Sequence, residues 1–318
     1  MSDVQEKIMP IGGQAVIEGV MMRSPKRIAT AIRRLNGEIE IKTDEFISLI
    51  HRRKYLNIPI FRGAVTLIEV MILGIKTLQW SADKAMEDLE QKEQKEESKK
   101  KSGMSTAGAI LTVSLALLLG ISMFFVLPLY LTTRVFSIEK QALLFNLVAG
   151  SIRIVLFLLY VWGISFLKDV KRLFEYHGAE HKTIFAFENK IFLSPDNAQQ
   201  FTTFHPRCGT SFLMIVMLIS VLFFACLDTL IIYFYGTITL LIRLLTHIPF
   251  IPIIGGISYE ALKASAKYSG SKWVKFFILP GLALQHITTG PPDDKQLEVA
   301  ICALKAALGD EYKNELVS

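Results

Sequence analysis

Cysteine is scarce in this chain, with three residues in 318, at positions 208, 226 and 302. They share no short spacing, which excludes a disulfide framework. The chain also lacks a dinucleotide-binding or Walker fingerprint and a basic stripe with interleaved aromatic side chains, so no nucleic-acid partner is expected. No basic segment followed directly by an apolar core and a cleavage site opens the sequence, so no secretory signal peptide is expected.

Long apolar runs, by contrast, are abundant. Hydrophobic residues make up 51% of the chain and the mean hydropathy is +0.40, values that are high for a soluble protein. The apolar residues gather in four stretches, 106–133, 142–167, 210–235 and 237–257, the last two forming a hairpin around Gly236. Each stretch reaches the ~20 residues that cross a bilayer core as a helix. The sequence therefore predicts an α-helical integral membrane protein with about four transmembrane helices.

Basic residues predict the orientation of these helices. The segment before the first span ends in three lysines, and the loop between the second and third spans carries Lys168, Lys171, Arg172, Lys182, Lys190 and Arg207. The opposite loops carry little more than Arg134 and Lys140. The positive-inside rule then places both termini and residues 168–209 on the cytoplasmic side of a bacterial plasma membrane. The net charge of +6 is explained by cytoplasmic loops that lie near anionic lipid. The lipid bilayer is therefore the expected partner. A homo-oligomer is left open.

The first third of the chain is expected to form two units outside the spans. Residues 1–62 are predicted to be a β-rich cytoplasmic unit, because extended segments flank Asn36-Gly37, a dipeptide that favours a type I′ hairpin turn. Residues 63–104 are predicted to begin as an amphipathic helix, interfacial or packed on the bundle. Their second half interleaves Glu and Lys, which fits an exposed helix or a disordered linker.

The rest of the chain divides into a transmembrane region, 105–257, and a C-terminal part, 258–318, of cytoplasmic or interfacial helices. Residues 273–287 are too short and too interrupted for a confident span, so an interfacial or re-entrant helix is expected. After Asp293, the residues Leu297, Ile301, Leu304 and Leu308 line one face of an amphipathic helix that should pack on the cytoplasmic unit.

A His-x-x-Glu-His motif lies in the 168–209 loop, at His177, Glu180 and His181. On a helix, residues four apart lie on the same face, so the two imidazoles can converge on one cation. In zinc proteases with this order of residues, the histidines bind zinc and the glutamate activates the bound water. The motif predicts a zinc site, or one for another divalent metal, with Glu180 as the catalytic base. The alternative interpretation is that these three residues bind no metal and belong to a solvated helix face.

Three further side chains are candidate ligands. His205 and Cys208 lie at the entry to the third span, and Glu260 leaves the fourth span on the same side. If both histidines of the motif, His205 and Cys208 bind one ion, the tetrahedral shell is full and the zinc is structural. If only three groups bind, with His205 or Glu260 as the third, a water position stays open for catalysis.

Two other sets of polar residues stand out. Gln14 and Glu18, in a glycine-rich run, are candidates for the wall of a site, although a satisfied salt bridge is the preferred explanation for Glu18 and Arg23. Ionisable groups inside the spans are costly and usually paired; here they are Arg153, Asp228 and Arg243.

Asp228 lies eight residues before Gly236 and Arg243 lies seven after it, so the two can meet at one depth as an ion pair. The alternative is a polar path for a solute or proton, with His247, Pro249 and Pro252 forming an irregular segment.

Together, four segments resemble the YqhQ-like family of uncharacterised bacterial membrane proteins: Gly12 to Arg23, Tyr176 to Lys182, His205 to Phe212 and Pro292 to Ala300. The resemblance implies a multi-pass membrane protein that is a metal-dependent enzyme, and it supplies no substrate. Pro291-Pro292 departs from the expected single proline after a polar residue, which affects no candidate site residue.

Two functions follow as hypotheses. The first is a membrane metal-dependent hydrolase of unknown substrate with its site at the cytoplasmic face. The second is a non-enzymatic transporter or membrane-assembly factor, in which the same residues form a structural metal site or an ion-pair network.

Overall fold

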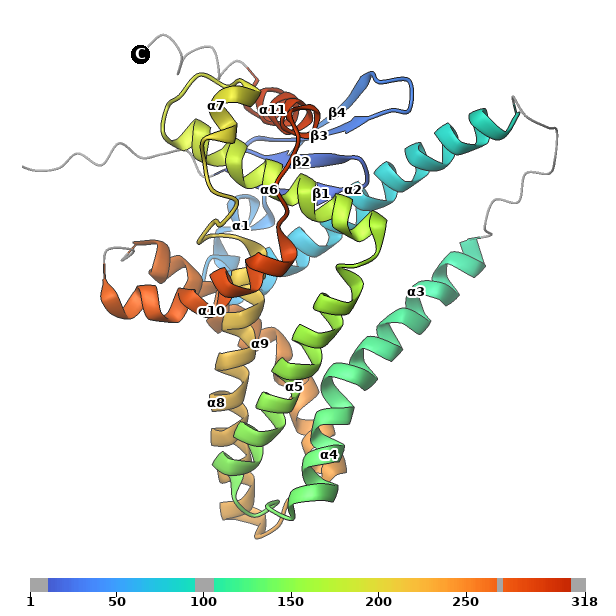
Figure 1. Cartoon of the computed structure of the whole chain (residues 1–318). Coiled ribbons are helices and arrows are strands. Elements are labelled where there is room, and N and C mark those ends of the chain that lie inside the picture. Colours follow the sequence, from blue (N-terminus) through green and yellow to red (C-terminus); the bar gives the residue numbers. More distant parts are fainter. Residues whose placement is uncertain (1–10, 95–105, 268–270, 310–318) are drawn as a thin grey trace, which may run out of the picture.

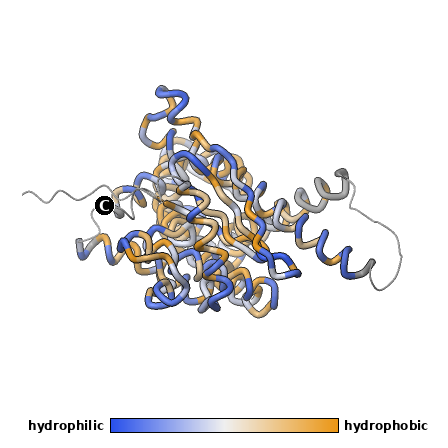
Figure 2. Tube along the Cα trace, turned by 90° about the horizontal axis from the view of Figure 1, so that it is seen from above, coloured by the Kyte–Doolittle hydropathy of each residue, from blue (hydrophilic) through white to orange (hydrophobic). Residues whose placement is uncertain are grey.

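The computed structural model describes residues 11–94, 106–267 and 271–309. Figure 1 shows a sheet and several helices gathered at one end, with long helices extending away from them. Seen from above, hydrophilic stretches lie mainly at the outside of this end (Figure 2). The two parts correspond to the expected β-containing unit and the expected helical bundle.

The N-terminal unit is an antiparallel four-stranded sheet in the order β1-β2-β3-β4. Its strands are β1 (Gly12–Val16), β2 (Gly19–Arg23), β3 (Arg27–Arg33) and β4 (Ile39–Glu45). Side chains alternate between the two faces of each strand, and here both faces are covered. One face buries Val20, Met22, Ala29 and Ala31, and the other buries Val16, Met21, Ile28 and Ile32. The sheet is therefore the middle layer of a three-layer arrangement.

The second face packs against α2 (Phe61–Gln94), whose Leu73 and Trp80 cover it. This helix continues into the charged stretch as far as Gln94, and residues 95–104 of the expected linker lie outside the described ranges. Two short helices, α1 (Leu49–Arg52) and η1 (Lys54–Leu56), connect the sheet to it.

The hairpin between β3 and β4 was predicted correctly, but its turn was not. A type I′ turn needs positive φ at both central residues, whereas Gly37 has φ 91° and Asn36 is not among the described residues with positive φ. The N–H of Gly37 donates to the carbonyl of Arg34 at 2.9 Å, and the N–H of Arg34 donates to Glu38 at 2.9 Å. These bonds define a three-residue loop in which only the glycine is left-handed.

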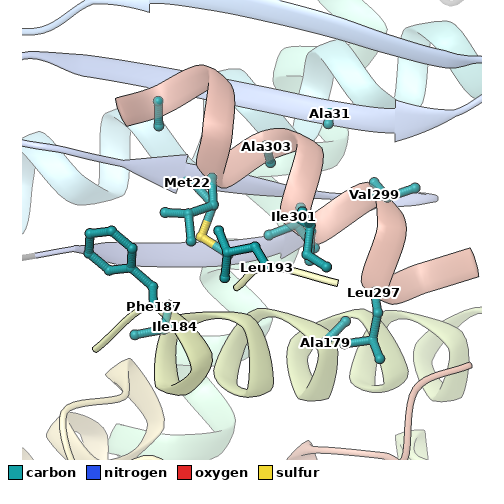
Figure 3. Close-up of a cluster of buried hydrophobic side chains, with 14 of the residues drawn as sticks. Met22, Ala31, Ala179, Ile184, Phe187, Leu193, Leu297, Val299, Ile301 and Ala303 are labelled. Carbon is teal, nitrogen blue, oxygen red and sulfur yellow. The ribbon is translucent and has the colours of Figure 1, made fainter. Parts of the chain in front are cut away.

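The first face of the sheet packs against α11 (Asp294–Leu308), which in turn lies on α6 (Lys168–Glu188) (Figure 3). All four leucines and isoleucines expected on the packing face are buried: Leu297, Ile301, Leu304 and Leu308. The helix begins with a capping box, in which the Asp293 carboxylate accepts from the N–H of Gln296 at 2.7 Å. The predicted C-terminal amphipathic helix is confirmed, and it packs against the N-terminal sheet.

This cap provides a test of the C-terminal helix. Asp293→Ala is expected to lower the free energy of unfolding by about 1 kcal/mol, because it leaves helix N–H groups without an acceptor. Asp293→Asn keeps an acceptor oxygen and should cost much less. Thermal unfolding of both detergent-purified variants measures the difference. Equal losses for the two variants would contradict a capping role.

Within the described ranges, four helices are long and apolar enough to cross a membrane. The first is interrupted by a π-helical turn and consists of α3 (Thr106–Ile121), η2 (Ser122–Val126) and α4 (Leu127–Phe136). The others are α5 (Ala142–Ile164), α8 (Gly209–Tyr235) and α9 (Leu240–Lys267). Gly236, with φ 74°, ends α8 and turns the chain, as the sequence indicated.

The remaining helices join the bundle to the sheet unit. The segment 168–209 is mostly helical, since it contains α6 and the short α7 (Pro195–Gln199). α10 (Lys272–Thr288) is shorter than the spans and packs on α8. α2 lies against α9, where Gly63 is so close that a Cβ there would be 2.8 Å from the carbonyl oxygen of Gly256. The expected packing of α2 on the bundle is thus confirmed.

Candidate metal centre

The His-x-x-Glu-His motif lies in the middle of α6, a helix that packs against the sheet unit. From Tyr176 to Phe187 nearly every side chain is buried, so the motif is not a solvated helix face. The rings of His177 and His181 lie one helical turn apart, with centroids separated by 4.4 Å. The helical spacing inferred from the sequence is confirmed.

Backbone carbonyls orient both imidazoles. Nδ1 of His177 lies 2.8 Å from the carbonyl oxygen of Thr288, at the end of α10, and Nδ1 of His181 contacts that of Thr203. A carbonyl only accepts hydrogen bonds, so each Nδ1 carries the proton and donates it. In a neutral ring this leaves Nε2 with a free lone pair, the tautomer that metal-binding histidines adopt through such partners.

Nε2 of His177 faces the thiol of Cys208. This residue is the N-cap of α8, and its Sγ lies 3.1 Å from Nε2 of His177. One ligand atom from each of His177, His181 and Cys208 lies within 4.8 Å of the others. Nε2 of His181 is buried and has no hydrogen-bond partner among the described residues. Burial is the main reason that the pKa of His181 is lowered, which keeps its ring neutral.

Glu180 lies beside this cluster, under strand β1. Its side chain is 5% exposed, and the backbone N–H of Gly13 donates to its carboxylate. A Cβ at Gly13 would lie 2.8 Å from that carboxylate, so only glycine allows the strand to approach so closely. Burial raises the pKa of Glu180, and the proximity of His177 and His205 and the hydrogen bond from Gly13 partly offset this effect.

His205 is buried next to the cluster but outside the group of three. Its backbone is held by Gln285, which accepts from its N–H at 2.7 Å and donates to its carbonyl at 2.8 Å. Its ring accepts from the N–H of Arg207 and lies 5.4 Å from the ring of His181, measured between centroids. Burial lowers the pKa of His205.

The structure does not bring Glu260 to the histidines. Both of its carboxylate oxygens bind the guanidinium of Arg62, one at 2.5 Å, where α9 lies against α2. Glu260 therefore has a fixed partner in place of the ligand role that the sequence left open to it.

Gln14 and Glu18 have structural partners as well. The Gln14 side chain lies against Gly74 of α2, where a Cβ would be 2.5 Å from its Oε1. Glu18 forms an ion pair with Arg172, with one oxygen at 2.5 Å, and it is not paired with Arg23. The guanidinium of Arg23 lies 4.2 Å from the ring centre of Phe46 instead.

A second polar cluster is fully buried in the bundle. Asp228 accepts from Nε of Arg243 at 2.8 Å, as the sequence predicted. It also contacts Nε2 of His247 and accepts from Nδ2 of Asn146, both at 2.8 Å. These last two partners were missed, although a lone asparagine within an apolar run is a signal that could have indicated one of them.

The groups that orient the first cluster could not have been found from residue types. Thr203 and Thr288 act through backbone carbonyls, which every residue carries. Gln285 acts through its position opposite His205, 80 residues earlier in the chain. Only the folded arrangement identifies these three residues.

Fold and site together define a mostly helical protein, whose described residues contain four membrane-compatible apolar helices, a small antiparallel sheet and a largely buried His-His-Cys cluster. The chain belongs to the family described as "Protein of unknown function (DUF1385)", which matches residues 58–310. It is similar to "Uncharacterized protein YqhQ" of Bacillus subtilis (strain 168), with 31% identity over 322 residues, 98% of this chain and 96% of the relative. The resemblance noted from the sequence is confirmed at this level. No solved structure matches.

Proposed function

We propose that this protein binds a zinc ion at the cytoplasmic face of a bacterial membrane through His177, His181 and Cys208, and uses it for hydrolysis. The observation that carries the proposal is the buried Nε2 of His181, which has no hydrogen-bond partner among the described residues, in a side chain grouped with His177 and Cys208. An unpaired buried acceptor costs about 1–3 kcal/mol, and a cation would satisfy it. Nitrogen and sulfur are ligands that zinc prefers.

The number of ligands favours catalysis over a closed structural site. Structural zinc sites have four protein ligands, whereas catalytic sites keep three and leave one position for water. His205 is the nearest candidate for a fourth ligand, but its ring lies with the Arg207 N–H on one side and Glu188 at 3.8 Å on the other. Zinc would supply a bound water whose pKa is lowered to about 7.

Glu180 would accept the proton from that water. Its carboxylate is buried beside the ligands, and burial raises its pKa, which is the direction in which enzymes tune a glutamate general base. The strand segment around Gly13 would exclude bulk water from the carboxylate. The orientation rests on the basic residues of the 168–209 segment, which lies at the same end of the molecule as this cluster.

Metal content tests the ligand set. Detergent-purified protein is equilibrated with zinc, desalted and measured by elemental mass spectrometry. We expect about one zinc per chain in the wild type, and a loss of at least about tenfold in affinity for His177→Ala, His181→Ala and Cys208→Ala. Glu260→Gln is the matched control, because its partner is Arg62, and it should bind zinc as the wild type does. No zinc in the wild type would overturn the proposal.

The role of Glu180 needs a separate measurement. Glu180→Gln should keep the metal, and it should lose about 10²–10⁴-fold of any zinc-dependent hydrolysis of chromogenic ester, phosphoester and peptide probes. Hydrolysis that is unchanged in Glu180→Gln would exclude it as the base. If His205→Ala also removed the metal, the site would be closed with four ligands, and the non-enzymatic alternative of a transporter or assembly factor would be favoured.

A further inference from the structure

A cavity of about 590 Å³ lies between α3, η2, α5, α8 and α9. Its wall is apolar apart from one arginine and one serine, and includes Gly120, Phe124, Arg153, Met217, Ser220 and Ile254. The volume is within the range of about 300–1,000 Å³ that small-molecule sites occupy. Figure 1 shows α3 diverging from α5 toward the sheet end of the molecule. Leu117, in the α3 part of the wall, is exposed.

Arg153 stands in the wall with most of its hydrogen-bonding capacity unused. Its Nε donates to the carbonyl of Phe124 at 2.9 Å and its Nη1 to the Ser220 hydroxyl at 3.4 Å. The ring centre of Phe125 lies 5.2 Å from the guanidinium carbon. A guanidinium has five N–H donors, and within the described ranges no acidic side chain forms a salt bridge with this one.

The depth of Arg153 makes this lack of a counter-charge costly. It is eleven residues from both Ala142 and Ile164, the ends of α5, or about 16 Å along the helix from each. In the membrane placement proposed above, that is the middle of the hydrocarbon core, where an ionised side chain is expensive and marks a functional site by default. Arg243, which is fully buried in the bundle, has the carboxylate of Asp228. Among the described residues, the partners of the half-buried Arg153 are neutral.

The helix opposite Arg153 is distorted at the point of contact. The π-helical turn η2 contains Phe124, whose carbonyl accepts from Arg153. A π-turn shifts the backbone register and leaves a carbonyl available to another donor, and such turns are frequent at functional sites. The distortion therefore holds the cation at the cavity wall with its remaining N–H groups free for a ligand.

We propose that this cavity binds a long-chain fatty acid from the bilayer, with the carboxylate on Arg153 and the acyl chain along the apolar wall. The guanidinium fork matches a carboxylate, and the pair would neutralise both charges at this depth. The apolar wall suits an acyl chain and would not hold a free inorganic anion. Ser220 and Cys208 are twelve residues apart on α8, about 18 Å, so this site is separate from the metal centre.

A photo-crosslinking experiment tests the proposal on the full chain in lipid nanodiscs. The probe is palmitic acid carrying a diazirine near the end of its chain, and mass spectrometry maps the modified residues. We expect modification of the cavity wall in α3, α8 and α9, competed by unlabelled palmitic acid. Arg153→Gln should weaken binding by at least about tenfold through loss of the charge-assisted hydrogen bonds. Palmitic acid methyl ester, which has no negative charge, should compete poorly.

Two glycine variants separate the cavity from general effects on the protein. Gly120 lines the cavity and Gly163 lies on α5 outside it, and a Cβ at either position meets no atom within 4 Å. Gly120→Leu should fill the cavity and abolish crosslinking of the wall, whereas Gly163→Leu should leave it unchanged. The proposal is overturned if a folded Gly120→Leu protein binds like the wild type. Equal competition by the methyl ester, or crosslinks confined to the outer surface of the bundle, would overturn it too.

Discussion

Asp228→Leu is expected to lower the free energy of unfolding by about 3–5 kcal/mol. The carboxylate is 0% exposed and is the counter-charge of Arg243, which is also 0% exposed. Without it, the guanidinium stays buried and uncompensated, and His247 and Asn146 lose an acceptor at the same time. Thermal or denaturant unfolding of the detergent-purified protein measures the effect.

The double variant Asp228→Leu with Arg243→Met is the decisive control. It removes both charges, and replacing a buried ion pair by apolar side chains is often neutral or even stabilising. It should therefore recover most of the stability that the single variant loses. If the double variant is as unstable as Asp228→Leu alone, the uncompensated charge is not the cause. A structural ion pair also predicts that zinc binding by the recovered double variant is normal.

Gly178→Ala is expected to disrupt the packing of α6 and with it the metal centre. A Cβ at Gly178 would lie 2.0 Å from the carbonyl oxygen of Gly290, a contact that real structures do not contain. The same two segments are tied by the N–H of Gly290, which donates to Phe174 at 2.8 Å. Because the clash is with backbone, no side-chain rotation relieves it. The displacement should also move His177 away from Thr288, two residues before Gly290.

Intrinsic helix propensity alone predicts that Gly178→Ala stabilises the protein, whereas the clash predicts that it destabilises it. The measured change in stability therefore distinguishes the two effects. Alanine is about 1 kcal/mol more favourable than glycine in a helix interior. Gly163→Ala in α5, where a Cβ meets no atom within 4 Å, should therefore be as stable as the wild type or slightly more stable. Gly178→Ala should show a lower unfolding temperature and reduced zinc content. Wild-type values for both would refute the close approach of α6 to Gly290.

The sequence predicted those features of the fold that depend on neighbouring residues. Apolar run length identified four long apolar helices of the described residues, and 3.6-residue periodicity identified the helix that carries Leu297 and Leu304. The convergence of His177 and His181 follows from one helical turn. All three inferences need only local geometry, so they do not depend on how distant segments meet.

Partners far apart in sequence were not predictable in the same way. Glu260 is bound to Arg62, 198 residues away, and no local pattern distinguishes that pairing from metal ligation. His205 and Cys208 lie three residues apart in one segment, yet the thiol reaches the histidine pair while Gln285 fixes the backbone of His205. The same holds for the hairpin loop. The sequence predicted the position of the turn, but the turn type depended on whether Asn36 adopted positive φ.

The packing of α11 on the sheet also determines when, during synthesis of the chain, the sheet can complete its core. The last strand, β4, ends at Glu45, and the helix that covers its sheet begins at Asp294, so all four apolar helices are synthesised between them. At about 5–20 residues per second, the sheet waits roughly 12–50 s for this covering helix to leave the ribosome. During that time Val20, Met22, Ala29 and Ala31 have no α11 against which to pack. A nascent chain that stalls before Asp294 therefore leaves this face of the sheet uncovered and open to recognition by chaperones or proteases. Completion of the sheet unit thus depends on synthesis of the whole apolar region that precedes α11.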